Sequence, residues 1–435
     1  MAVASLRDEA VELLQGLIRL DTANPPGNET LAAEFLRDYL RDSGVDCELY
    51  ARVPERANLV ARLPGRGRGP RLALLSHTDT VLADAAEWQV DPWSGERRGD
   101  EVWGRGALDM KGQCAAGAVA IASLAREGFE PNGDVIFLAA ADEEVGDGYG
   151  LSWLCEAHPE AVRAEYSVNE GAGERELLGG RPYYTCSLAE KMSRPFRLRV
   201  LGRSGHASMP AIADNALVKA ARLIERLGEY QPPRRYMPET EALVRTVLGE
   251  LPDPEEVLER LEAVGPEARE LVEPLLAPTF SPTMATASQK RNVIPAVCEV
   301  TVDCRVLPGE DLDALDRLVH DVLGEADYEY ELLEAAGGTR SPGGTPLWDA
   351  VASFVHEVDP EAEPVPFCVP GFTDSHWLRS AFGTVAYGFF PMRTMEAELA
   401  ARLIHSADER VHVDDLELGT EFLRHAARAI GSLEG

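Results

Sequence analysis

The feature that most restricts the fold is the alternation of short apolar runs with helical stretches through the first 190 residues. Three apolar runs, 72–76, 135–141 and 166–168, are typical of buried strands. Helices are expected at 31–43 and 111–127. This order predicts a wound α/β sheet, in which the residues that follow the strands gather at one edge and form the ligand site.

Beyond residue 190 the pattern of elements changes. Strands are expected at 196–202, 298–306 and 328–333, and helices at 215–227 and 311–323. We interpret this part of the chain as a small α+β insert within the wound α/β protein.

A long segment of the insert, 231–282, carries nine prolines and many acids. Its prolines favour short helices at the surface, and its leucines are too frequent for a disordered segment. A glycine-rich stretch at 337–344 indicates the return to the first domain. We therefore predict one domain made of 1–188 and 338–435, and a second domain made of 189–337.

The charge and the hydropathy of the chain exclude several classes of partner. The length of 435 residues suits two or three domains. Acidic residues outnumber basic ones by 74 to 42, which gives a formal net charge of −32. A field of that sign repels nucleic acid and anionic membrane surfaces, so neither is expected as a partner. The longest nearly apolar run, 115–125, is far below the roughly 20 residues that span a bilayer.

The N-terminal stretch and the cysteines predict a cytoplasmic protein. Charged residues at 7–9 interrupt the first apolar positions, which favours an amphipathic helix over an export signal. The seven cysteines are odd in number and scattered, and no two form a Cys-x-x-Cys pair. Neither a disulfide framework nor a thiolate zinc site is therefore indicated, and a reducing compartment is expected.

Histidine and acidic residues follow two of the predicted strands directly. His77 and Asp79 come after the first strand, and a carboxylate in this position can fix the tautomer of a metal-binding imidazole. Asp142, Glu143 and Glu144 come after the second strand. Three adjacent acids at the end of a buried strand repel one another unless cations compensate them.

Further polar residues lie at the third strand, at a helix start and near the C-terminus. Glu170 follows the third strand, Asp109 precedes the helix at 111–127, and His405 lies far downstream. Taken singly, Asp109 is explained as a helix N-cap and the acidic run as a solvated loop. Taken together, two histidines and several carboxylates form a ligand set suited to two Zn²⁺-like ions. One bridging acid, with one histidine and one further acid for each ion, leaves Glu143 as a free base.

Four short motifs occur in order along the chain. They are Ser-His-Thr-Asp-Thr-Val at 76–81, Trp-Gly-Arg-Gly-x-x-Asp-Met-Lys-Gly at 103–112, Asp-Glu-Glu-x-Gly at 142–146 and Gly-Arg-Ser-Gly-His-Ala-Ser at 202–208. Together they resemble the zinc metallopeptidase family of aminoacylases, acetylornithine deacetylase, succinyl-diaminopimelate desuccinylase and glutamate carboxypeptidase. The resemblance extends from the Asp-Thr-x-Asn-Pro-Pro-Gly stretch near the N-terminus to the region of His405.

The resemblance implies a catalytic α/β domain with a mixed sheet and a co-catalytic site for two zinc ions per subunit, or cobalt or manganese in their place. It implies that Asp109 bridges the two ions, that Asp79 orients His77, and that Glu143 is the general base and then the general acid. The remaining ligands implied are His77 and Glu170 for one ion, and His405 and Glu144 for the other.

The insert resembles the family's ferredoxin-like lid, which also forms the dimer. The resemblance implies a homodimer in which His206 reaches the active site of the other subunit and polarises the scissile carbonyl. Asn292 and Arg305 match the family's binders of the substrate carboxylate, and a guanidinium can grip both oxygens of that group. Gly371 and Thr373 lie in a segment that resembles the loop beside this carboxylate.

The function expected from the sequence is a metal-dependent hydrolase that cleaves an amide bond of an N-acyl amino acid or small peptide with a free carboxylate. A water that bridges the metal ions would attack the amide, with Glu143 as the base. The alternative is a non-catalytic protein that binds amino acids or peptides on the same scaffold. A serine hydrolase is excluded, because His206 stands where the Gly-x-Ser-x-Gly motif needs its last glycine.

Overall fold

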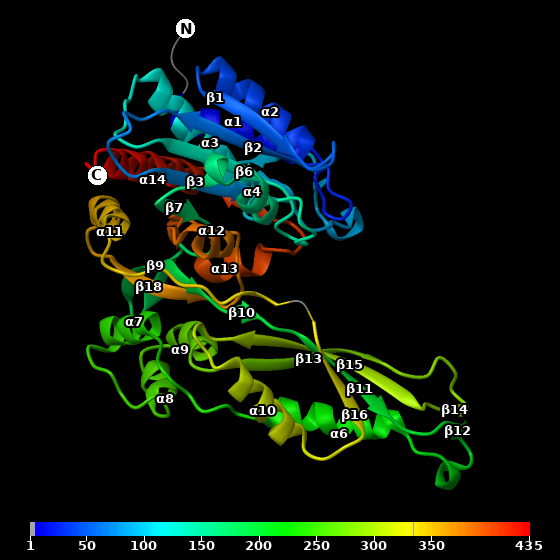
Figure 1. Cartoon of the computed structure of the whole chain (residues 1–435). Helices are drawn as coiled ribbons and strands as arrows, with labels where there is room; N and C mark the ends of the chain where they lie inside the picture. Colours follow the sequence, from blue (N-terminus) through cyan, green and yellow to red (C-terminus); the bar gives the residue numbers. More distant parts are fainter. Residues whose placement is uncertain (1–4, 334) are drawn as a thin grey trace. The chain divides into compact units, whose positions relative to one another are not determined.

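The computed structural model describes residues 5–333 and 335–435, which divide into two compact units (Figure 1). Unit 1 holds the residues up to Leu188 together with Ser341–Phe367 and Thr373–Gly435. Unit 2 holds Ala189–Arg340 and Cys368–Phe372. The domain limits expected from the sequence stay a prediction, because compactness alone does not show that a unit folds by itself.

Unit 1 is built on a mixed β-sheet. Its strands are β1 (Asp46–Ala51), β2 (Ala57–Leu63), β3 (Leu72–His77), β6 (Val135–Ala140), β7 (Tyr166–Asn169), β8 (Arg175–Leu178), β9 (Arg181–Glu190), β18 (Glu363–Val369) and β19 (Val385–Gly388). The strand order is β1-β2-β6-β3-β7-β19-β9-β18, and β8 pairs with β9. The central strands β6, β3, β7 and β19 run parallel to their neighbours within this group, whereas β1, β2 and β9 pair antiparallel. The predicted α/β class with a mixed sheet is thereby confirmed.

Helices pack on this sheet, and unit 1 also contains a small second sheet. The helices are α1 (Leu6–Ile18), α2 (Thr30–Asp42), α3 (Lys111–Arg126), α4 (Leu151–Ala157), α5 (Pro159–Val162), α11 (Pro346–Val358), α12 (Ser375–Phe382), α13 (Ala397–Leu403) and α14 (Val413–Gly431), with a short 3₁₀ turn at Ala85–Glu87. The small sheet has the order β20-β5-β4, with β4 at Glu96–Arg98, β5 at Glu101–Trp103 and β20 at Arg410–His412.

The central strands are buried on both faces, as their unbroken apolar sequences require. In β3, Leu72 and Leu74 pack into the core formed with α1, α3 and α14. Ala73 and Leu75 pack into a different core, formed with α4, α5 and α12. Because the side chains of a strand alternate between the two faces, two helix layers hold each central strand. The ends of these strands are therefore well-fixed positions for functional residues.

Unit 2 contains an antiparallel sheet covered by two helices. Its strands are β10 (Met192–Ser193), β11 (Phe196–Leu201), β13 (Thr279–Thr286), β15 (Val297–Val306), β16 (Tyr328–Leu332) and β17 (Ala336–Gly337). The order is β16-β11-β15-β10-β17, and β13 pairs with β15. With α6 (Ala216–Glu229) and α10 (Leu312–Leu323), the chain order β11-α6-β13-β15-α10-β16 is a β-α-β-β-α-β arrangement. Inward residues such as Leu198 and Val300 pack against Leu223 and Val319 of these helices.

The proline-rich segment of unit 2 forms short helices, as the sequence predicted. They are α7 (Pro238–Leu248), α8 (Val257–Glu262) and α9 (Pro266–Val272), followed by a 3₁₀ turn at Glu273–Leu275. A separate two-stranded sheet pairs β12 (Gly205–His206) antiparallel with β14 (Val293–Ile294), and a 3₁₀ turn at Pro210–Ile212 follows β12. Within residues 5–333 and 335–435, no helix has the length and apolar character needed to cross a membrane.

Candidate metal centre

Polar residues at the ends of three neighbouring parallel strands form the centre of the candidate site. His77 is the last residue of β3, the acidic run 142–144 follows β6, and Glu170 follows β7. Because β6, β3 and β7 are adjacent and parallel, their carboxyl ends open at the same edge of the sheet. The gathering of polar residues that the strand pattern predicted is found at this edge.

One carboxylate lies between the two histidines. Asp109 directly precedes Met110 and α3, and its Oδ1 lies 3.1 Å from Nε2 of His77. Its Oδ2 lies 3.0 Å from Nε2 of His405. The N-cap residue of α3 is Met110, so Asp109 does not serve as the helix cap that its position also suggested. A carboxylate whose two oxygens face two imidazoles has the geometry of a bridging metal ligand.

Three glutamates lie beside these histidines. Glu144 Oε2 is 3.3 Å from Nε2 of His405. Glu170 Oε1 is 3.7 Å from Nε2 of His77, and Glu143 Oε2 is 4.0 Å from the same nitrogen. The structure therefore brings together all five side chains expected as metal ligands, with the expected base next to them.

The carboxylate of Asp79 holds the backbone of the acidic run. It accepts hydrogen bonds from the backbone N–H groups of Glu143 and Glu144, at 3.2 and 3.1 Å, and from Nδ2 of Asn24 at 2.9 Å. Nδ1 of His77 lies 3.0 Å from the backbone carbonyl oxygen of Asp79 and 3.4 Å from its Oδ1. The backbone oxygen is thus the nearer partner of the imidazole.

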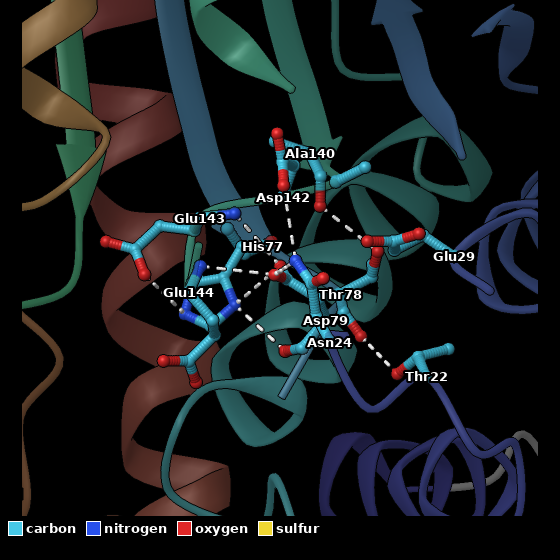
Figure 2. A network of polar contacts seen from close by, with 12 residues as sticks. Thr22, Asn24, Glu29, His77, Thr78, Asp79, Ala140, Asp142, Glu143 and Glu144 are labelled. Carbon is cyan, nitrogen blue, oxygen red and sulfur yellow. Dashed lines mark hydrogen bonds and ion pairs between the residues drawn. The ribbon is translucent and has the colours of Figure 1, made fainter. Parts of the chain in front are cut away.

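The first acid of the run, Asp142, belongs to a buried network behind the site. Its Oδ1 accepts hydrogen bonds from Nη2 of Arg56 at 3.0 Å and from Nδ2 of Asn24 at 3.2 Å. Arg56 also donates from Nε to Glu29 at 2.6 Å. Figure 2 shows Asn24 between Asp142 and Asp79, beside the residues of the site. Asp142 adopts a positive φ of 68°, which this network compensates. The charge of Asp142 is therefore balanced by an arginine.

The charges of the site strongly perturb its titration. Burial and the neighbouring Glu170 carboxylate raise the pKa of Glu143 well above its usual value. Burial also raises the pKa of Glu170 to about 8, against the opposing effect of His77. The hydrogen bonds to Asp109 and Glu144 raise the pKa of His405 to about 10. Burial disfavours the charged form of Asp109, yet His405 and His77 hold its pKa below the usual value.

The donor set fits divalent metal ions. Ligand atoms of His77, Asp109 and Glu144 lie within 4.8 Å of one another, as do those of His77, Glu143 and Glu170. Oε1 of Glu144 is buried and accepts no hydrogen bond from the residues that the structure describes. A cation would supply the partner that this buried oxygen lacks among the described residues. Imidazole nitrogens mixed with carboxylates are ligands that zinc, cobalt and manganese accept.

The expected residues of the insert lie at different places in unit 2. His206 of β12 pairs with Val293, and the backbone oxygen of Asn292 accepts from Ala207 N at 3.1 Å, so His206 and Asn292 are close. Arg305 lies at the other end of β15, where it donates to Asp303 at 2.9 and 3.0 Å. Eight residues of extended strand separate Arg305 from the start of β15, a span of about 26 Å. Within one copy of unit 2, Asn292 and Arg305 do not meet.

The remaining expected residues lie between β18 and α12. Thr373 is buried in unit 1, and its Oγ1 accepts from the backbone N–H of Ser375 at 3.2 Å. Ser375 in turn accepts from Nδ2 of Asn169, the residue before Glu170, at 3.2 Å. This contact places the start of α12 next to the end of β7. Gly371 falls within the segment Cys368–Phe372 of unit 2.

Several buried polar residues that hold the site were not predicted from the sequence. Asn24, Arg56, Glu409 and Glu29 are almost fully buried. The first three contact the segments that carry the expected ligands, and Glu29 contacts Arg56. The sequence around Arg56 looks like that of any surface arginine, and no local signal indicates its burial. Glu409 offers a weak signal, because it lies only four residues after His405.

Comparison with known proteins assigns the family. The model of peptidase family M20/M25/M40 matches residues 73–429. Succinyl-diaminopimelate desuccinylase of Cereibacter sphaeroides strain KD131 is 28% identical over 425 residues, covering 94% of this chain and 95% of the relative. Aminoacylase-1 of Sus scrofa is 26% identical over 436 residues, covering 98% and 96%. The chain belongs to peptidase family M20/M25/M40, as the motifs indicated.

Solved structures show the same fold. An M20 family metallo-carboxypeptidase from Sulfolobus solfataricus superposes with a TM-score of 0.75 at 20% identity, covering 98% of this chain and 99% of that chain. A dinuclear metal binding peptidase of the M20 family from Bacillus subtilis gives a TM-score of 0.64 at 14% identity, covering 98% and 99%. The likeness of fold therefore extends over nearly the whole chain, the insert included.

Proposed function

We propose that the protein is a metal-dependent hydrolase that cleaves an amide bond of an N-acyl amino acid or a small peptide with a free carboxylate. The observation that carries the proposal is the Asp109 carboxylate, whose two oxygens face His77 and His405. Membership of a peptidase family, and relatives named as a desuccinylase and an aminoacylase, support the same class of reaction.

Each side chain of the candidate metal centre has a proposed role. Asp109 would hold both metal ions, His77 and Glu170 would hold one, and His405 and Glu144 would hold the other. We propose zinc, with cobalt or manganese able to replace it. When bound, the ions lower the pKa of water and polarise the amide carbonyl.

Glu143 and Asp79 are proposed to serve the proton transfer and the geometry. Glu143 takes a proton from the attacking water on its carboxylate and delivers it to the amine nitrogen that leaves. Its backbone N–H is held by Asp79, and Asp79 also lies against Nδ1 of His77. Asp79 therefore fixes both the base and the imidazole that presents Nε2 to the metal.

Unit 2 is proposed to be a lid and a dimerisation domain. Exposed apolar side chains occur near the β12–β14 pair and on α6 and β13, including Ile212, Val218 and Met284, and such a surface suits a second copy of the chain. We propose that His206 and Asn292 act on a substrate held by the other subunit, since they lie far from Arg305 within one copy. Arg305 would grip the substrate carboxylate, and Gly371 and Thr373 would line the same side.

The test of the reaction is a pair of glutamate substitutions. Glu143→Ala should lower kcat by about 10² to 10⁴, because it removes the proton carrier, while about two zinc ions per chain stay bound. Glu144→Ala should lose zinc as well as activity. The exposed Glu398→Ala serves as the control and should change neither. Hydrolysis is followed by chromatography of N-acyl amino acids and dipeptides with added zinc, cobalt or manganese. A fully active Glu143→Ala enzyme would remove the proposed base.

The same assay separates the hydrolase from a binding protein, and a second one tests the dimer. A zinc-loaded chain that binds these compounds without cleaving any of them would support the binding protein instead. If His206 acts across subunits, mixing His206→Ala with Glu143→Ala should restore part of the activity. A dimer that exchanges chains without any recovery would contradict the proposed position of His206. We also propose a cytoplasmic location, supported by the seven free cysteines.

A further inference from the structure

Glu409 is a fully buried carboxylate that binds the loop before α3. Its Oε2 accepts hydrogen bonds from Nη1 of Arg105 at 2.6 Å and from the backbone N–H of Gly106 at 3.1 Å. Its Oε1 accepts from the backbone N–H groups of Leu108 at 2.7 Å and of Asp109 at 3.0 Å. Four donors therefore converge on one side chain, and one of them belongs to the residue that faces both histidines.

Glu409 also ends the loop that carries His405. His405 and Asp408 both adopt a positive φ, of 60° and 61°, which non-glycine residues rarely do. The loop therefore needs anchors to keep this conformation. One anchor is Gln89, whose backbone N–H and Nε2 donate to the carboxylate of Asp408 at 2.8 and 2.7 Å. The other anchor is Glu409 itself, whose backbone oxygen accepts from Gly104 N at 2.9 Å.

The two candidate metal positions are supported in different ways. His77 and Glu170 stand at the ends of adjacent parallel strands, where the sheet fixes them. His405 stands on a loop, and the side chain of Glu409 links that loop to Asp109. Loss of Glu409 should therefore disturb the His405 side of the site more than the His77 side.

We propose that Glu409 is a positioning residue that fixes Asp109 and His405 relative to each other, and so sets the affinity for the metal ion at His405 and Glu144. This inference rests on the proposed function. Residues that orient metal ligands typically contribute about 10-fold to 100-fold to metal affinity. The role assigned to Glu409 is to keep two ligands from distant parts of the chain at bridging distance.

The test is Glu409→Gln, followed by titration of the metal-free protein with zinc or cobalt. Glutamine has nearly the same shape, but its NH₂ group must face two of the four donors in either orientation. The wild-type protein should bind two ions tightly. The variant should bind one ion with nearly unchanged affinity and the second at least about 10-fold more weakly. Two ions bound as tightly as by the wild type would overturn the proposal.

Asp415→Asn is the matched control for general destabilisation. Asp415 is also fully buried, and its carboxylate accepts from the backbone N–H groups of Arg393, Thr394 and Met395 at 2.7 to 2.8 Å. That loop carries none of the expected ligands. Asp415→Asn should lower the melting temperature of the metal-free protein but keep both ions; Glu409→Gln should lower it further, because it also leaves the buried Arg105 without its carboxylate. An equal loss of the second ion in both variants would reduce Glu409 to a structural residue.

Two further measurements keep the outcome decisive. If Glu409→Gln does not fold, Glu409→Asp replaces it, because a carboxylate shortened by one methylene cannot reach all four donors. Equal affinity for the second ion in Glu409→Asp and the wild type would then overturn the proposal. A wild-type protein that binds no metal would instead contradict the proposed function.

Discussion

The buried arginine behind the acidic run gives a strong prediction for stability. The side chain of Arg56 is 6% exposed, and its partners Glu29 and Asp142 are 0% and 1% exposed. Arg56 donates to Glu29 at 2.6 and 2.8 Å, to Asp142 at 3.0 Å and to the backbone oxygen of Pro26 at 3.2 Å. Arg56→Met keeps much of the side-chain volume but leaves two buried carboxylates without their cation.

The expected loss is large because the remaining charges stay buried. Removal of one partner of a buried ion pair costs about 3 to 5 kcal/mol. Unit 1 has more than 250 residues, so each kcal/mol corresponds to about 2 °C of melting temperature, and Arg56→Met should melt about 6 to 10 °C below the wild type. The double variant Arg56→Met/Glu29→Leu should recover part of this loss, since only Asp142 keeps its charge and it retains the donor Asn24.

The assay is calorimetry of the metal-free proteins, with Arg402→Met as the control. Arg402 pairs with Glu398 at 3.6 Å, but both side chains are strongly exposed, so this pair contributes at most about 1 kcal/mol. Equal melting temperatures for Arg56→Met and Arg402→Met would refute the reasoning. A double variant less stable than Arg56→Met would show that Glu29 does not carry an uncompensated charge.

Three further predictions concern the metal, the pH and the packing of glycines. Removal of metal by a chelator should abolish hydrolysis of an N-acyl amino acid, and zinc, cobalt or manganese should restore it; full activity of protein shown to be metal-free would contradict this. Burial lowers the pKa of Lys191 from 10.5 to about 8, so the unfolded chain holds this proton more tightly than the folded one. The free energy of unfolding should therefore increase as the pH rises between these two values, by up to about 3 kcal/mol. Lys191→Met should lack that part of the rise in urea unfolding; an identical pH profile would count against it. A Cβ at Gly388 would lie 2.0 Å from the backbone oxygen of Glu170, so Gly388→Ala should destabilise the protein and weaken metal binding. Gly228 in α6 has open space around it, so Gly228→Ala should stabilise the protein by up to about 1 kcal/mol. Both variants are measured by urea unfolding and by zinc titration. Unchanged zinc affinity in Gly388→Ala would be the opposite result.

The sequence predicts the strands and the edge residues well, because both follow from short-range patterns. The runs expected at 72–76 and 135–141 are β3 and β6, and each differs from the observed strand by one residue. His77 and Glu170 needed only the rule that ligands collect at the carboxyl ends of parallel strands. This rule alone could not predict Asp109 as a ligand, because its position before α3 equally suits a helix cap.

The interactions that hold the site could not be predicted from the sequence, because they join residues far apart in the chain. Nothing near Arg56 shows that it will meet Asp142, and nothing near Arg105 shows that it will meet Glu409. The expected hydrogen bond between His77 and the Asp79 carboxylate is longer than the one to the Asp79 backbone. The carboxylate also accepts from the N–H groups of Glu143 and Glu144, which a strand pattern cannot reveal.

The order of the proposed metal ligands along the chain determines when the set is complete during synthesis. His77, Asp109, Glu144 and Glu170 are all synthesised before unit 2, whereas His405 is synthesised after it. During translation, four of the five side chains are therefore present before the insert is made, and the fifth is added only after the insert has been synthesised. A polypeptide terminated before His405 would contain His77 but not all five proposed ligands. The complete site can therefore form only in chains that have been synthesised beyond the insert.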